Sequence, residues 1–260
     1  MKNIRILMIG NSFSDDTIEH VYPILRDMGY DEIVLGNLYI GGCSINMHLG
    51  NLLNDVPVYY YRLNTEGTWV TTPGTRMSDA LRSEPWDIIS MQSGTSDGSG
   101  NTNLATFARL PRFIALVRSY VPQAKLVWNM TWVGEPGCSH RDYLLYDCDG
   151  DKQYRDMMTT VRACVLTCPE ITCIAATGTA VENARSSYLG KHLCRDYYHL
   201  SLGMGRYVAG LTFAAAVTGG NLGAVKFAPE EVDERMKAVA LEAAANAVRS
   251  PFAITPATDR

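Results

Sequence analysis

The chain has 260 residues, of which 47% are apolar and 19% are charged, and its formal net charge is −4. This composition is typical of soluble globular proteins. Lys and Arg form no run, so nucleic acid and anionic membranes are not expected as main partners, because both attract clustered cations. No apolar stretch is long enough to span a bilayer.

The first residues, MKNIRILMIG, are too short for the apolar region of a signal peptide and run into a glycine turn. As it stands, the sequence predicts a cytoplasmic protein, or a periplasmic or secreted one if a leader has been removed. The seven Cys residues lack zinc-ligand spacing, so we expect buried, reduced thiols and no metal site. Cys43 lies among candidate site residues, but with no partner His evident nearby we expect it to be a packing residue.

In chain order, residues 4–9 form a continuous apolar-rich run ending at Gly10, which is typical of a buried parallel strand. Helical spacing follows over residues 17–28, with Asp15 and Asp16 just before it, where carboxylates favour a helix start. The alternation that continues along the chain predicts a doubly wound parallel sheet. Its further strands are expected over residues 33–39, 87–91, 125–130 and 171–175, and its further helices over 104–120, 152–166 and 179–189.

Two stretches depart from this alternation. Residues 59–71 contain two β-like runs and predict a hairpin, at about residues 58–72, inserted beside the sheet. Residues 134–151 are polar and Gly-rich and predict a surface loop, whose acids at 147–151 form an incomplete calcium-binding pattern. Helices are expected over 202–218 and 230–249. Without internal repeats, residues 1–260 are interpreted as a single domain.

Ligands of an open parallel sheet bind outside the carboxyl ends of its strands. The first strand ends before Ser12, the second before Gly42 and the third before Gln92, and Asp196 and His199 follow the fifth. A serine needs a base to act as a nucleophile, and an Asp three residues before a His can fold back to orient the imidazole. These residues therefore predict a Ser-His-Asp site, although a serine after a strand can also simply cap a helix.

Three motifs resemble the SGNH hydrolase superfamily, also called GDSL-like esterases and lipases. Gly10-Asn11-Ser12 resembles its first block, Gly42 its second-block glycine, and Asp196-Tyr197-Tyr198-His199 its last block. The third block departs from the family's Gly-x-Asn-Asp, because the chain has Met91-Gln92-Ser93-Gly94; Gln92 resembles the amide donor of some carbohydrate-esterase branches. Asn11 in place of Asp is a second departure.

The resemblance implies a flavodoxin-like, three-layer α/β/α fold with a parallel sheet of about five strands. It also implies a carboxylic-ester hydrolase that needs neither metal nor cofactor and acts on short, often acetyl, esters. Ser12 would be the nucleophile, His199 the base and Asp196 its orienting acid. The backbone N–H groups of Ser12 and Gly42, with the Gln92 amide, would form the oxyanion hole.

The expected partner is a small-molecule or carbohydrate ester. Asn11 and Trp132 are the candidate substrate-binding residues, and Trp69 and residues 59–61 add aromatic rings that can stack on sugars, although ordinary packing explains them equally well.

Several alternatives remain. Residues 94–98 match the Gly-x-Ser-x-Gly elbow of α/β-hydrolases, which would make Ser96 the nucleophile. His192 is a rival base close to Asp196. A catalytically degenerate carbohydrate-binding module and an acyltransferase are compatible with the same motifs.

Overall fold

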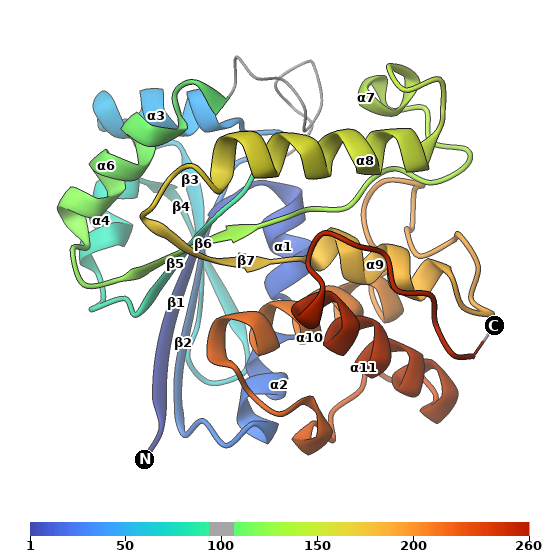
Figure 1. Cartoon of the computed structure of the whole chain (residues 1–260). Helices are drawn as coiled ribbons and strands as arrows, with labels where there is room; N and C mark the ends of the chain where they lie inside the picture. Colours follow the sequence, from blue (N-terminus) through green and yellow to red (C-terminus); the bar gives the residue numbers. More distant parts are fainter. Residues whose placement is uncertain (94–106, 260) are drawn as a thin grey trace.

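A seven-stranded sheet forms the centre of the computed structural model, which describes residues 1–93 and 107–259 (Figure 1). The strand order is β4-β3-β2-β1-β5-β6-β7. The strands are β1 (Asn3–Gly10), β2 (Glu32–Tyr39), β3 (Tyr59–Asn64), β4 (Trp69–Thr75), β5 (Ile88–Met91), β6 (Lys125–Asn129) and β7 (Ile171–Ala175).

Five of these strands are parallel and follow the order second, first, third, fourth and fifth along the chain. This is the flavodoxin-like order, in which β1 lies at the point where the chain changes direction across the sheet. Ile6 of β1 pairs with Leu35 on one side and Ile88 on the other, and it is fully buried. Burial on both faces explains why β1 is almost continuously apolar. The predicted α/β, flavodoxin-like fold is confirmed.

The predicted hairpin belongs to the same sheet instead of lying beside it. β3 pairs antiparallel with β2, with Leu38 opposite Tyr61, and β4 pairs antiparallel with β3. Gly67 in the connecting turn has a φ of +88°, a conformation that glycine adopts without steric cost. The hairpin ends at Thr75, a few residues beyond the expected boundary.

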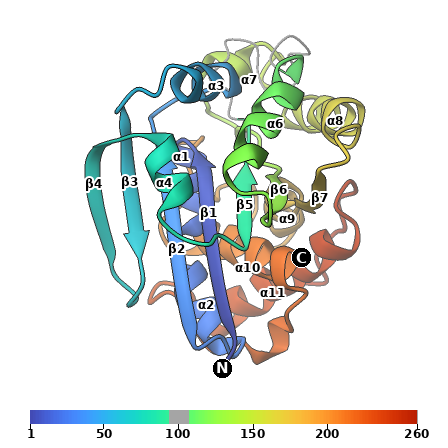
Figure 2. The ribbon, with the colours of Figure 1, turned by 90° about the vertical axis from the view of Figure 1, so that its left-hand side faces the viewer.

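Helices cover both faces of the sheet (Figures 1 and 2). On one face, α10 packs against α1, α2, α9 and α11, and on the other α3, α4 and α6 pack together. Among the described residues, no helix is long and apolar enough to cross a membrane. The helices named so far are α1 (Ser12–Ile18), α2 (Val21–Asp27), α3 (Ile45–Leu53), α4 (Met77–Arg82), α6 (Leu110–Tyr120), α9 (Thr177–Arg185), α10 (Met204–Thr218) and α11 (Glu234–Arg249).

Several helix boundaries differ from the prediction. The single helix expected over 17–28 is two helices, and the first begins at Ser12, because Asn11 caps it. α3 and α4 were not predicted, and the expected loop at 134–151 contains a short helix, α7 (Arg141–Leu144). The helix expected over 152–166 is α8 (Gly150–Thr160), followed by a π-helical turn, Val161–Val165. Residues 104–106 of another expected helix lie outside the described residues.

Candidate active site

The first strand and the first helix deliver Ser12 to the carboxyl end of the sheet. Ser12 is the first residue of α1 and is separated from β1 only by Asn11. Asn11 has an extended backbone, and its side-chain Oδ1 accepts a 3.0 Å hydrogen bond from the N–H of Phe13. Asn11 is therefore the N-cap of the helix, which leaves the hydroxyl of Ser12 available for another partner.

Gly10 makes this turn sterically feasible. A Cβ at position 10 would lie 2.7 Å from Ser14 Oγ and 3.0 Å from Gln92 Cδ. The Ser14 hydroxyl in turn donates a hydrogen bond to the carbonyl of Asn11. A larger residue would push these side chains away from the turn that carries Ser12, so the glycine is required here by close packing.

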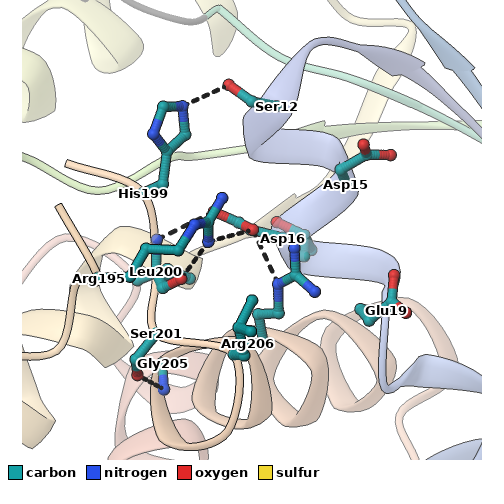
Figure 3. A network of polar contacts seen from close by, with 12 residues as sticks. Ser12, Asp15, Asp16, Glu19, Arg195, His199, Leu200, Ser201, Gly205 and Arg206 are labelled. Atoms are coloured by element: carbon teal, nitrogen blue, oxygen red, sulfur yellow. Dashed lines mark hydrogen bonds and ion pairs between the residues drawn. The ribbon is translucent and has the colours of Figure 1, made fainter.

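A chain of hydrogen bonds joins three of the predicted residues. His199 Nε2 lies 2.9 Å from Ser12 Oγ, and His199 Nδ1 lies 2.7 Å from Asp196 Oδ2. Figure 3 shows the His199 ring directed at the Ser12 hydroxyl. Because a carboxylate only accepts, the proton of a neutral His199 is on Nδ1. Nε2 is then the acceptor of the Ser12 hydroxyl proton, which is the arrangement that general-base catalysis requires.

A tight turn brings Asp196 back onto His199. Asp196 Oδ1 accepts the backbone N–H groups of Tyr198, at 3.1 Å, and His199, at 2.6 Å. Within this turn, Tyr197 has a φ of +64°, which is uncommon for a residue other than glycine. Partial burial by itself raises the pKa of Asp196, but the hydrogen bonds from the His199 ring and from the His199 and Tyr198 N–H groups outweigh it and lower that pKa. The carboxylate therefore remains ionised beside the imidazole.

A cavity of about 210 Å³ opens beside Ser12 and His199. Gly42, which the sequence predicted as an oxyanion donor, lines it and has a φ of +64°. Two residues that sequence reasoning missed, Tyr198 and His140, line it as well. Their rings stack with centroids 4.2 Å apart and planes within 9°. Tyr198 lies at a position that the Asp-x-x-His motif leaves open, and no motif contains His140. The cavity is completed by Asn11 and Phe13.

Gln92 lies behind this cavity and not in its wall. It is buried, and its Nε2 donates a 2.8 Å hydrogen bond to Asn11 Oδ1. Its Oε1 accepts from Asn129 Nδ2 at 3.4 Å. Asn11 Nδ2 donates to the carbonyl of Cys43, so the polar groups of the Asn11 side chain all bond to protein atoms. In this structure Gln92 and Asn11 thus connect the ends of β1 and β5 beneath Ser12.

Trp132 does not face the cavity as we expected. Its side chain is 1% exposed, and its Nε1 donates a 2.8 Å hydrogen bond to the carbonyl of Tyr198. The ring of Phe13 lies 4.5 Å from it, between centroids. A sugar cannot stack on a ring that is buried in this way, so the interpretation of Trp132 as a substrate platform is wrong. Trp132 instead supports the turn that carries His199.

Comparison with known proteins places the chain in a family. Residues 5–247 match the family described as a domain of unknown function, DUF4886. The chain belongs to the DUF4886 family. A DUF4886 protein from Bacteroides uniformis ATCC 8492, known from a crystal structure, is 32% identical, with a TM-score of 0.92 over 99% of each chain. No curated protein matches the chain.

A more distant structural likeness extends beyond DUF4886. A protein from Parabacteroides merdae ATCC 43184 that is designated a GDSL-like lipase superposes with a TM-score of 0.56 at 13% identity. The match covers 84% of this chain and 96% of the other. At that identity the likeness shows only that the two proteins share a fold.

The remaining histidines of this DUF4886 chain occupy other surroundings. His48 Nδ1 lies 3.4 Å from Cys43 Sγ and 2.9 Å from the Tyr59 hydroxyl, so our expectation that Cys43 has no histidine nearby is wrong. The two residues lie five positions apart, across the start of α3, a helix that was not predicted. His192, the rival base, is largely exposed and lies 3.6 Å from Glu135.

The other expectations concern cysteines, metals and the rival serine. Cys148 is exposed, contrary to the expectation that the cysteines are buried, and Cys164, Cys173 and Cys194 are only partly buried. Residues 1–93 and 107–259 contain no group of three or more metal-ligating side chains. In the calcium-like stretch, Asp147 pairs with Lys152 at 2.7 Å, and Asp149 caps α8. Ser96 lies outside the described residues.

Proposed function

We propose that this DUF4886 protein is a serine hydrolase that cleaves short-chain acyl esters. The observation that carries the proposal is the hydrogen-bonded series from Asp196 through His199 to Ser12, at the end of the sheet where ligands of such folds bind.

In the proposed reaction, His199 Nε2 takes the proton of the Ser12 hydroxyl while Ser12 Oγ attacks the ester carbonyl. The negative charge formed on the carbonyl oxygen is stabilised by the backbone N–H groups of Ser12 and Gly42. His199 then gives its proton to the leaving alcohol. A water molecule, deprotonated by His199, releases the carboxylic acid and restores the serine.

Gln92, which the sequence predicted as an oxyanion donor, is given a different role in this proposal. Its Nε2 bonds to Asn11 Oδ1 in a buried position. We therefore propose that Gln92 fixes the turn that carries Ser12, by holding the Asn11 cap. A direct bond from Gln92 to the oxyanion would require its amide to turn away from Asn11.

The size of the cavity favours a short acyl group. Its volume of about 210 Å³ lies below the ~300–1,000 Å³ of pockets that hold drug-sized ligands. Phe13, Tyr198 and His140 give it an aromatic wall. An acetyl group is the simplest acyl group that fits these limits. The alcohol is proposed to be a carbohydrate hydroxyl. This proposal rests on the resemblance to the SGNH hydrolases, because Trp132 is buried and cannot stack on a sugar.

The test compares wild type with Ser12→Ala and Ser96→Ala, using p-nitrophenyl acetate and p-nitrophenyl octanoate. We expect hydrolysis of the acetate ester by wild type and Ser96→Ala, a much slower reaction with octanoate, and loss of activity in Ser12→Ala. Activity that survives in Ser12→Ala but disappears in Ser96→Ala would overturn the proposal.

A fluorophosphonate probe followed by peptide mass spectrometry provides a second readout that needs no particular alcohol. We expect covalent modification of Ser12. Labelling of Ser12 without ester hydrolysis would point to acyl transfer to another alcohol, to be tested with acetylated sugars as donors. A wild-type protein that neither hydrolyses esters nor is labelled would count against the hydrolase proposal, and sugar binding would then be tested.

A further inference from the structure

The carboxylate of Asp16 lies one helical turn after Ser12 on α1 and is fully buried. Its Oδ1 accepts hydrogen bonds from Arg195 Nη1, at 2.9 Å, and from Arg206 Nε, at 2.8 Å. Its Oδ2 accepts the backbone N–H of Leu200 at 2.9 Å. Figure 3 shows these bonds converging on Asp16 below the His199 ring.

Two of these partners enclose the segment that bears the proposed base. Arg195 directly precedes Asp196, and Leu200 directly follows His199. The backbone closes the same segment, because the Arg195 N–H donates to the His199 carbonyl at 2.8 Å. The Arg195 side chain also donates to the carbonyl of Leu200. Asp16 therefore holds both ends of a short closed loop, and Arg206 links it to the first turn of α10.

We propose that Asp16 is a positioning residue that sets the separation between Ser12 Oγ and His199 Nε2. Asp16 belongs to the helix that begins at Ser12, and it bonds to the loop that contains His199. One carboxylate therefore fixes the position of His199 relative to Ser12. The expected effect of Asp16 on catalysis rests on the proposed function, but the separation of Ser12 Oγ and His199 Nε2 can be measured without a substrate.

A buried ion pair need not add stability, because desolvation of the charges offsets their attraction. The carboxylate is nonetheless needed once the two guanidinium groups are in place. In Asp16→Asn, an uncharged amide would face Arg195 and Arg206, and part of that amide would present donors to donors. We expect the loop to shift in response, with the His199 ring moving away from Ser12.

Asp15 provides a matched control on the same helix. Its Oδ1 accepts a 2.7 Å hydrogen bond from Arg62 Nη1, on β3, and another from Asn37 Nδ2, on β2. Asp15→Asn thus also removes a carboxylate from an arginine, but it affects contacts with β2 and β3 and not the loop with His199. Asp16→Asn weakens the contacts between α1 and the loop with His199, whereas Asp15→Asn weakens the contacts between α1 and the sheet.

The experiment measures kcat and KM for p-nitrophenyl acetate, the urea midpoint and a crystal structure for wild type, Asp16→Asn and Asp15→Asn. We expect kcat of Asp16→Asn to fall about 100-fold, as misplacement of a catalytic group by about 1 Å does, with KM little changed. The crystal structure should show His199 Nε2 beyond hydrogen-bond reach of Ser12 Oγ. Asp15→Asn should keep the wild-type kcat and geometry.

Arg195→Gln serves as the second variant if Asp16→Asn fails to fold, because the Arg195 side chain is 35% exposed and its loss is easier to tolerate. In Arg195→Gln we expect the His199 ring to move away from Ser12 by a smaller distance than in Asp16→Asn. Wild-type kcat and an unchanged Ser12–His199 separation in the folded variant would overturn the inference, even if the urea midpoint fell. If wild type hydrolyses no ester, the proposed function fails, while the measured separation still decides whether Asp16 positions His199.

Discussion

Ser12 and His199 are separated by 187 positions in the sequence, yet Ser12 Oγ and His199 Nε2 lie 2.9 Å apart. Ser12 is fixed by the first strand and its capped helix, and His199 by a short loop that follows α9. The two meet because both segments end at the carboxyl edge of the sheet and because Asp16 bonds the loop to the helix.

Asp196→Asn should lower kcat for p-nitrophenyl acetate by about 10⁴-fold, as a carboxylate-to-amide change does in a Ser-His-Asp triad. The amide can donate to His199 Nδ1, which favours the tautomer with the proton on Nε2 and removes the acceptor for Ser12. Steady-state kinetics and circular dichroism would check the prediction. Full activity in a correctly folded Asp196→Asn protein would argue against the role of this carboxylate.

Gln92 and Asn11 should behave as one unit in catalysis. Gln92 Nε2 donates to Asn11 Oδ1, which itself caps the helix of Ser12, so removing either side chain loosens the same turn. We expect the effects of Gln92→Leu and Asn11→Ala on kcat to be non-additive, with a coupling energy of about 0.5–3 kcal/mol in a double-mutant cycle. Strictly additive effects would instead indicate that Gln92 acts separately, as a direct oxyanion donor would.

His48 should make the protein less stable in acid. Burial lowers the pKa of His48 to about 3, whereas an unfolded histidine has a pKa of about 6.5. Between these values the unfolded chain binds the proton and the folded chain does not, so the free energy of unfolding falls as the pH falls from about 6.5 towards 3. The slope contributed by one such group is at most about 1.4 kcal/mol per pH unit.

Urea unfolding of wild type and His48→Gln between pH 4 and 7 would measure this contribution. Glutamine does not titrate, and its amide can bond to the Tyr59 hydroxyl that His48 contacts at 2.9 Å. We expect the free energy of unfolding to depend less steeply on pH in His48→Gln than in wild type. Parallel pH profiles for the two proteins would mean that His48 is not the group responsible.

Arg185→Met should destabilise the protein by about 3–5 kcal/mol, the usual cost of leaving a buried charge without its partner. Arg185 bonds to Glu135 at 3.1 Å and to Glu182 at 2.5 Å, and the side chains of all three are almost completely buried. Glu135 also accepts the N–H of Leu193, at the base of the loop with His199. The urea midpoint is the measurement.

Arg235→Met is the control for that prediction. Arg235 forms a two-point ion pair with Asp259, but both side chains are exposed, so water and salt screen the attraction. We expect a small change in the urea midpoint. If the urea midpoint fell equally in Arg185→Met and Arg235→Met, burial of the ion pairs of Arg185 would not be what makes them important for stability.

Much of the fold could be predicted because its signals are local. The apolar run before Gly10 and the alternation of strands and helices predicted the parallel sheet and the strand ends on which Ser12, Gly42 and Gln92 lie. The helical spacing from residue 17 predicted too late a start for α1, because the Asn11 side chain accepts the Phe13 N–H and begins the helix at Ser12. α3, which was not predicted, begins after Ser44, whose hydroxyl oxygen accepts the Met47 N–H and caps the helix.

The sequence by itself determined the residues that meet at the site and the local geometry of the Asp196–His199 turn, because three-residue spacing lets Asp196 reach both the backbone and the ring of His199. Only the tertiary structure decided what faces the cavity. Trp132 is buried beneath Tyr198, His140 enters the wall, and Asp16 meets two arginines from distant segments. Such contacts depend on how the loops pack after the sheet has formed, and packing between distant segments leaves no periodic pattern in the chain.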